Sequence, residues 1–162
     1  MKKLKDAAGP LDRITTRVRL LEQHCGPILY QLPPRWRYNR ERIITFLDLL
    51  PRDLTHVLEL RDESWYNDGL FELLEERGIS YCAHDMQGLP PLKRAIGPIA
   101  YARFHGTTGR YTGSYGRERL APWCDWLGEE LDAGREIYAY FNNDYEARAI
   151  GDAMLLREML SA

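Results

Sequence analysis

The chain has 162 residues, of which 44% are hydrophobic and 28% are charged, and its formal net charge is −2. This length and composition are typical of one globular domain and exclude an intrinsically disordered chain. The small negative charge gives no overall attraction to nucleic acid or to an anionic membrane, and no apolar run is long enough to span a bilayer. We therefore expect a single cytoplasmic domain with no membrane partner.

Cysteine and histidine spacing gives no sign of a metal site. Cys25, Cys82 and Cys124 are far apart in the sequence and none has a CxxC partner, so we expect free thiols in a reducing compartment. His84 and Asp85 are neighbours in an expected strand, where adjacent side chains point to opposite faces and cannot hold one ion. We predict no metal, and no pattern identifies a cofactor.

The first third of the chain alternates helical and extended patterns. Apolar spacing predicts a helix over residues 11–24, after Pro10. Residues 28–32 form a short apolar run that predicts a strand, which two prolines end. Asn39 is suited to cap a second helix that stops at Pro51.

A strand is expected over residues 55–61, and it carries the most informative pattern. Alternation places Glu59 and Arg61 on one face, with Leu58 and Leu60 on the other. An apolar helical stretch follows, closed by Gly78. The charged pair therefore lies at the carboxyl end of a strand that leads into a helix, where ligands bind in α/β folds.

Three more strands are expected over residues 79–85, 99–105 and 135–141. Helical patterns follow the last two, one starting at Pro122 and ending near Gly134, and one over residues 150–160. A strand followed by a helix about every 30 residues predicts βα units with a parallel sheet. The predicted fold class is α/β, resembling an incomplete TIM barrel of about five strands.

Each predicted strand ends in polar residues, which are Gln31, Glu59, Arg61, Asp85, Arg103, His105, Asn142, Asn143 and Asp144. In a parallel sheet these ends meet at one rim. Glu59 or Asp85 is then a candidate base and His105 a candidate acid or proton relay. Arg61 and Arg103 are candidates to hold an anion, with Gln31, Asn142 and Asp144 as further substrate-binding residues.

A structural interpretation of the same residues is also open. Glu59 with Arg61, and Arg103 with Asp85, would form ion pairs that fill a barrel, while the 143–144 pair would cap the last helix. The protein is then a non-catalytic binding or interaction protein. The two hypotheses differ in whether a cavity remains above the charged residues.

Two further stretches have functional interpretations. Residues 106–116 contain four glycines and several hydroxyl side chains, which suits either phosphate binding by backbone N–H groups or a mobile surface loop. Four arginines between positions 35 and 42 lie beside Trp36 and Tyr38 and suggest nucleic-acid processing. The overall acidity weighs against that reading, and we expect no nucleic-acid partner.

Four sequence blocks resemble the DUF72 family, also called YecE-like. They are GPILYQLPPRW at 26–36, LELRDESW at 58–65, YARFHG at 101–106 and IYAYFNND at 137–144, the last followed by a helix that ends in LREML. The resemblance implies a TIM-type barrel and draws attention to the polar strand-end residues. It implies no established activity and no catalytic assignment.

The resemblance also implies a difference in length. Family members are longer, and their first strands, including one with an E-x-N-x-[ST]-F-Y motif, have no counterpart before Met1. A complete (β/α)₈ barrel needs about 250 residues. We therefore expect residues 1–162 to form a partial DUF72 domain with two exposed sheet edges, which favour self-association.

Overall fold

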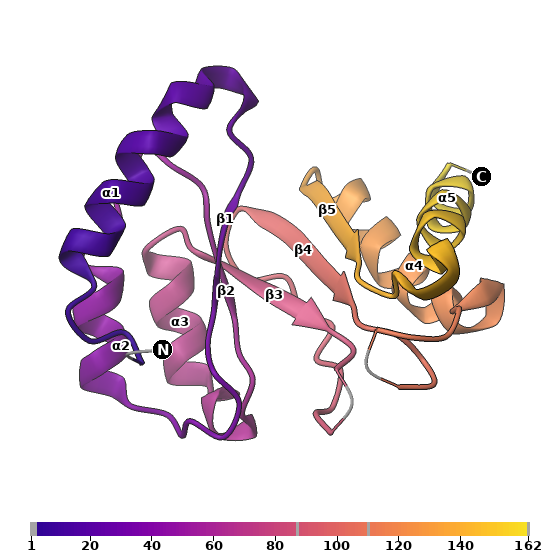
Figure 1. Ribbon diagram of the computed structural model, residues 1–162, viewed down its shortest axis with the longest axis horizontal. Coiled ribbons are helices and arrows are strands. Elements are labelled where there is room, and N and C mark those ends of the chain that lie inside the picture. Colours follow the sequence, from indigo (N-terminus) through magenta and orange to yellow (C-terminus); the bar gives the residue numbers. More distant parts are fainter. Residues whose placement is uncertain (1–2, 87, 110, 162) are drawn as a thin grey trace.

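The computed structural model describes residues 3–86, 88–109 and 111–161. Its centre is a sheet of five parallel strands in the order β1-β2-β3-β4-β5, so each strand pairs with the next strand along the chain. The strands are β1 (Ile28–Gln31), β2 (His56–Glu59), β3 (Ser80–His84), β4 (Ile99–Phe104) and β5 (Glu136–Phe141). The sheet curls into part of a barrel (Figure 1), which confirms the predicted α/β, TIM-barrel-like fold.

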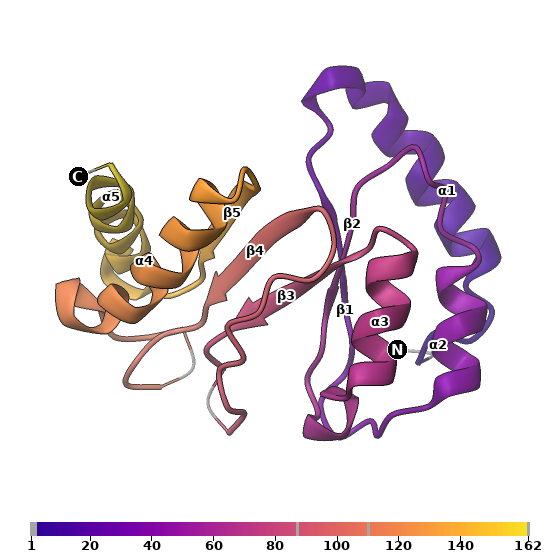
Figure 2. The same ribbon diagram turned by 180° about the vertical axis from the view of Figure 1, so that it is seen from behind.

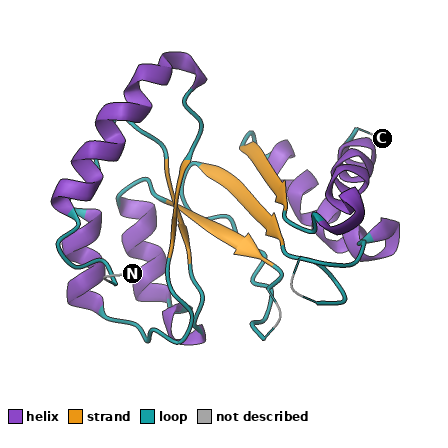
Figure 3. Cartoon of the chain, viewed as in Figure 1, coloured by secondary structure: helices purple, strands orange, loops and turns teal. Residues whose placement is uncertain are grey.

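Helices cover the outer side of this curled sheet. They are α1 (Ala8–Val18), α2 (Arg40–Leu47), α3 (Asp68–Glu76), α4 (Gly116–Asp132) and α5 (Arg148–Leu160). Helices α1, α2 and α3 lie beside β1 to β3, and α4 and α5 lie beside β5, as the two opposite views show (Figures 1 and 2). Strands and helices therefore form two layers (Figure 3). In the part of the chain that is described, no helix is long and apolar enough to cross a membrane.

The two faces of the sheet have different neighbours. Leu58 and Leu60 are buried in the large apolar core between the sheet and the helices, as the alternation predicted. Val57, Cys82 and Tyr101 belong instead to a small apolar cluster on the concave face. Because side chains alternate along a strand, Glu59 and Arg61 share this concave face with Val57.

Local sequence signals fix several helix ends. The side chain of Asn39 accepts a hydrogen bond from the backbone N–H of Arg42, which confirms it as the N-cap of α2. Gly78 follows the end of α3 with a φ of +64°, a conformation that favours glycine. The predicted stop at Gly78 is therefore confirmed.

Several predicted helix boundaries were wrong. Helix α1 begins at Ala8, so Pro10 lies inside it, and α2 ends at Leu47 and not at Pro51. The first helix ends at Val18 and continues as a 3-10 helix over Arg19–His24, with Glu22 at a φ of 48°. Helix α4 begins at Gly116, so Pro122 lies inside it and not at its start. The backbone N–H groups of Tyr115 and Gly116 donate to the buried carboxylate of Asp152. This long-range cap fixes the start of α4 and leaves no local sequence signal.

Candidate functional site

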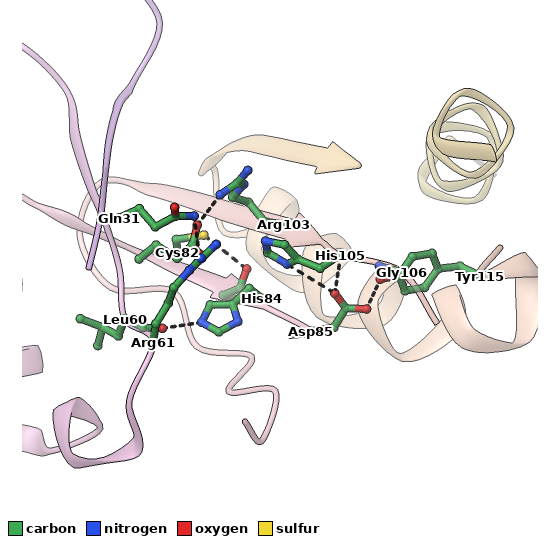
Figure 4. A network of polar contacts seen from close by, with 12 residues as sticks. Gln31, Leu60, Arg61, Cys82, His84, Asp85, Arg103, His105, Gly106 and Tyr115 are labelled. Carbon is green, nitrogen blue, oxygen red and sulfur yellow. Dashed lines mark hydrogen bonds and ion pairs between the residues drawn. The ribbon is translucent and has the colours of Figure 1, made fainter. Parts of the chain in front are cut away.

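Glu59 is the centre of a closed polar network on the concave face of the sheet (Figure 4). Its side chain is fully buried. Oε1 accepts from Nε of Arg61 at 2.6 Å and from Nε2 of Gln31 at 2.9 Å. Oε2 accepts from Nη1 of Arg103 at 2.5 Å. The parallel register of β1 and β2 places Gln31 directly beside Glu59, whereas Arg103 reaches Glu59 from β4, on the far side of β3.

Burial and the neighbouring arginines have opposite effects on the pKa of Glu59. Burial alone would raise the pKa of Glu59, but the two arginines outweigh it and lower the pKa below its ordinary value. Glu59 is therefore an ionised carboxylate with both oxygens held by charge-assisted hydrogen bonds. Such a group is a poor proton acceptor, and this geometry suits it to hold Arg61 and Arg103 in place.

His84 lies on the same concave face of the sheet. The sequence spacing excludes it as a metal ligand together with Asp85, because adjacent side chains in a strand point to opposite faces. His84 on β3 lies opposite Arg103 on β4 in the parallel register, and His84 is fully buried. Nε2 of His84 lies 2.6 Å from the carbonyl oxygen of Leu60. Burial lowers the pKa of His84, so the ring is a neutral N–H donor to that carbonyl. His84 therefore fixes the backbone at the end of β2.

His105 differs from these residues because it is buried without hydrogen-bond partners. Its side chain is 7% exposed, and neither Nδ1 nor Nε2 has a hydrogen-bond partner among the described residues. Burial lowers the pKa of His105 from an ordinary value of 6.5 to about 4. The ring is thus neutral at pH 7, with one nitrogen free to accept a proton.

A pocket of about 300 Å³, which we call the mouth pocket, opens above the strand ends. Its walls are Pro34, Arg61, Met86, His105, Gly106, Gly109 and Tyr111. These residues lie beyond the ends of four successive strands, β1 to β4. The convergence of strand ends that the sequence predicted therefore produces a cavity of the size that binds small molecules.

Asp85 lies on the other side of the loop formed by residues 106–116. Its Oδ1 accepts the backbone N–H of His105 at 2.8 Å, and its Oδ2 accepts the hydroxyl of Tyr115 (Figure 4). Nδ1 of His105 lies 3.9 Å from Oδ1, which is too far for a hydrogen bond. Asp85 faces a second pocket of about 340 Å³, whose walls also include Tyr115, Arg119 and Trp123.

Burial raises the pKa of Asp85 from 3.8 to about 6, despite the hydrogen bonds that stabilise its charged form. Asp85 therefore titrates close to neutral pH, as general acids and bases do. Its side chain does not line the mouth pocket beside His105. It contacts His105 through the backbone, so its contribution to the mouth pocket is to hold the start of the 106–116 loop.

The predicted residues after β5 are not brought into the mouth pocket. The backbone N–H of Asn142 continues the ladder by donating to the carbonyl of Phe104. Asp144 is exposed at the start of a 3-10 helix, and its side chain makes no capping hydrogen bond. Asn143 is buried and donates to the carboxylate of Asp152 at 2.7 Å and to the carbonyl of Gly113 at 2.8 Å.

Tyr115 and Asp152 are the residues that sequence reasoning missed. Asp152 is 2% exposed and accepts hydrogen bonds from Asn143, from the Ser114 hydroxyl and from two backbone N–H groups at the start of α4. Tyr115 links Asp85 to the backbone N–H of Gly106. Tyr115 lies at the end of a loop and Asp152 lies in an amphipathic helix. A single polar residue in such a stretch follows no spacing pattern that would identify it in the sequence.

The ring of Trp36, which lies in the arginine-rich stretch, packs against Trp65 at a centroid distance of 4.9 Å. Both tryptophans are buried, so neither offers a free face. No group of three or more His, Cys, Asp or Glu residues suited to a metal ion occurs among the described residues. The candidate site therefore consists of the mouth pocket, with His105 and Arg61 as its polar groups.

Parallel βα units in a curled sheet, with polar side chains at the strand carboxyl ends, define a protein of the TIM-barrel class. The family model described as "Protein of unknown function DUF72" matches residues 1–162, and the chain belongs to this family. This confirms the resemblance seen in the four sequence blocks. A search of curated proteins finds no match.

Solved structures of DUF72 proteins share this fold. One, from Thermotoga maritima MSB8, is 26% identical with a TM-score of 0.85, and the match covers 98% of this chain and 67% of that one. Two structures of a DUF72 protein from Enterococcus faecalis V583 have TM-scores of 0.79 and 0.77 at 18% and 19% identity. They match 92% of this chain and 64% and 66% of their own. This chain thus spans about two thirds of their length.

Proposed function

We propose that this protein binds a small anionic or polar organic ligand in the mouth pocket, and that His105 exchanges a proton with it. One observation carries the proposal. A histidine whose two ring nitrogens have no hydrogen-bond partner among the described residues, and whose side chain is 7% exposed, lines a pocket of about 300 Å³ beside an arginine. Unpaired buried polar groups cost free energy, so they are retained mainly where a ligand or water completes them.

The charges around the pocket suit an anion. Arg61 donates to Glu59 through its Nε atom and also lines the mouth pocket. A guanidinium group offers paired N–H donors that match a carboxylate or phosphate. Burial lowers the pKa of His105 to about 4, so the ring is neutral at pH 7 and one of its nitrogens can accept a hydrogen bond or a proton from the ligand. In this account Glu59 and Asp85 position the arginines and the loop.

Methionine methyl groups provide a direct test of ligand binding. The structure places Met86 in the wall of the mouth pocket, whereas Met154 and Met159 lie on α5 and are not among its lining residues. In protein labelled with ¹³C at the methionine methyls, titration with benzoate should shift the Met86 signal in a saturable manner. The signals of Met154 and Met159 should stay in place.

The variant His105→Gln separates binding from a bulk solvent effect. It retains hydrogen-bonding groups but removes the ring, so benzoate should shift Met86 several-fold less at equal concentration. An unchanged Met86 signal in the wild-type protein, at concentrations up to the solubility of benzoate, would contradict the proposal. Equal shifts in all three methionines would contradict it as well.

A nucleic-acid role has weaker support from the structure. The aromatic residues of the basic stretch, Trp36 and Tyr38, both pack edge-on against Trp65. Trp36 is also buried, so its ring does not offer a face for base stacking. Arg35, Arg37 and Arg40 of this stretch are exposed.

We further propose that the protein self-associates through its sheet edges. Among the described residues, β1 pairs only with β2 and β5 only with β4. Tyr140 on β5 is 44% exposed and stacks on Tyr101 at 5.1 Å. Sedimentation velocity should show a concentration-dependent dimer that Tyr140→Lys weakens. A monomer at all concentrations would contradict this proposal, while leaving the ligand proposal intact.

A further inference from the structure

We infer that the ligand of the mouth pocket is a phosphate monoester with a compact, weakly polar head, and that Arg35 and Arg37 bind its phosphate. This inference rests on the proposed function, because it places the head of the ligand in the mouth pocket. It adds a second binding region, from whose residues the chemical class of the ligand is inferred.

The second region is an open groove of about 520 Å³, which we call the entrance groove. It is lined by Pro34, Arg35, Arg37, Arg61, Asp62, Glu63, Ser64, Met86, Gly88 and Leu89. Three of these residues, Pro34, Arg61 and Met86, also line the mouth pocket. The two cavities are therefore adjacent, with these three residues between them. A ligand that extends outward past these side chains would reach the entrance groove.

Arg35 and Arg37 are unpaired cations in this groove. Both are exposed, and neither has an ion-pair or hydrogen-bond partner among the described residues. Arg35 has a φ of 57°, a left-handed backbone conformation that residues other than glycine rarely adopt. Such strain persists where the surroundings fix it, and it is frequent at ligand-binding sites. The β1–α2 connection thus presents two free guanidinium groups to the groove.

Two acidic residues also line the entrance groove and determine where an anion can sit. Oδ1 of Asp62 accepts hydrogen bonds from the N–H and the hydroxyl of Ser64, so this carboxylate stabilises the turn after β2. Glu63 is exposed. Like charges repel, so an anionic group is favoured on the wall formed by the arginines of the β1–α2 connection.

The shape and chemistry of the two cavities define the ligand. Pro34, Met86 and Tyr111 give the mouth pocket apolar and aromatic walls, with His105 as a single unpartnered polar side chain among its described lining residues. A compact aromatic or aliphatic head fits these walls. Two guanidinium groups outside suit a dianion with three terminal oxygens, because each arginine can donate two parallel hydrogen bonds. A phosphate monoester combines both features, whereas a simple carboxylate occupies only the inner pocket.

The test compares phenyl phosphate with benzoate, using the Met86 methyl signal to measure both dissociation constants. In the wild-type protein, phenyl phosphate should bind about tenfold more tightly than benzoate, the size of effect expected from added charge-assisted hydrogen bonds. The double variant Arg35→Ala/Arg37→Ala should lower phenyl phosphate affinity by about the same factor. Benzoate affinity should change less than twofold in this variant.

The matched control is Arg40→Ala/Arg42→Ala, which removes two charges from the adjacent helix α2 outside both cavities. It should leave both affinities nearly unchanged. Equal loss of phenyl phosphate binding in the two double variants would overturn the inference in favour of general electrostatics. Equal wild-type affinity for phenyl phosphate and benzoate would overturn it while leaving the mouth pocket proposal standing.

A single-stranded oligonucleotide without a terminal phosphate serves as a third probe. It should fail to shift Met86 at concentrations where phenyl phosphate saturates the signal. Binding of this oligonucleotide at least as tight as that of phenyl phosphate, and lost in both double variants, would overturn the inference, because it would indicate a polyanion-binding surface.

Discussion

Glu59 ends β2 and His105 follows β4, and both lie on the concave face of the sheet, yet their surroundings are opposite. Both oxygens of Glu59 are held by Gln31, Arg61 and Arg103. Neither ring nitrogen of His105 has a hydrogen-bond partner among the described residues. The first group has completed its interactions within the chain, and the second has not. Burial at the rim of a barrel therefore does not by itself mark a candidate functional residue, whereas His105 is a candidate because its unpartnered polar atoms are buried at the wall of a cavity.

This difference has an energetic basis. A buried carboxylate is tolerated because two arginines and an amide compensate its loss of hydration. A buried imidazole avoids the same cost by remaining neutral, which its lowered pKa indicates. Removing a partner should therefore be severe at Glu59, whereas a change at His105 should affect ligand binding more than folding. The following predictions test this contrast from its largest expected effect to its smallest.

Glu59→Gln should produce the largest loss of stability. The change leaves the partly buried Arg61 and Arg103 close together without a compensating charge, and breaking a buried ion pair typically costs about 3–5 kcal/mol. Urea denaturation, followed by far-UV circular dichroism, measures the free energy of unfolding. Asp53→Asn, which breaks an exposed ion pair with Arg19, should leave the unfolding midpoint unchanged. Similar midpoints for these two variants would contradict a structural role for Glu59.

Asp152→Asn should have the next largest effect on stability. The new amide nitrogen would face the donors that now bind the carboxylate, from Asn143, Ser114 and the start of α4. Buried donors left without acceptors cost about 1–3 kcal/mol. The 106–116 loop should also become more accessible to limited proteolysis, because Asp152 anchors its final residues. An unchanged cleavage rate would show that the loop is held by other contacts.

Asp85 and His105 should contribute pH dependences of opposite sign. The folded pKa of Asp85 is raised to about 6, so the folded state binds more protons between pH 4 and 6, and this contribution to stability falls as pH rises. The folded pKa of His105 is lowered to about 4, so the unfolded state binds more protons, and its contribution rises up to about pH 6.5. The two contributions partly cancel in the wild-type protein.

Single variants remove this cancellation. Relative to wild type, Asp85→Asn should become more stable as pH rises from 4 to 6, by about 1–3 kcal/mol across this window. His105→Asn should show a difference of the opposite sign, with its advantage greatest near pH 4. Unfolding free energies measured at several pH values provide the test. Parallel curves for wild type and both variants would refute the assigned protonation states.

Tyr115→Phe should have the smallest effect. It removes the hydroxyl that donates to Asp85 and accepts from the N–H of Gly106, but it keeps the ring contacts with Phe104 and Phe141. We expect a loss of about 1 kcal/mol in the free energy of unfolding, typical of hydrogen bonds in folded proteins. Tyr115→Leu would lose the ring packing as well, and a cost no larger than that of Tyr115→Phe would show that the ring contributes nothing.

The sequence predicted the fold because each element carries a local signal. Alternation at Glu59 and Arg61, the N-cap at Asn39 and the glycine at position 78 all act over a few residues. The alternation of strand and helix then determined a parallel sheet. The start of α4 was missed because its cap, Asp152, is distant in sequence.

The candidate site was predictable only in part. Strand-end position identified the members of the Glu59 network and His105. It could not show that Asp85 turns toward Tyr115, away from the mouth pocket, because the strand has ended and the loop sets the direction of the side chain. It also could not show that Arg35 and Arg37 line a groove adjacent to the pocket, since that depends on the path of the β1–α2 connection.

The protonation of His105 tests the account most directly. NMR titration of its ring, assigned by comparison with His105→Gln, should give a midpoint near pH 4 in the free protein. Saturating phenyl phosphate should raise this midpoint, because a bound anion stabilises the imidazolium form. A midpoint at the ordinary value of 6.5 that does not respond to phenyl phosphate would contradict a buried, ligand-facing histidine at the mouth of the barrel.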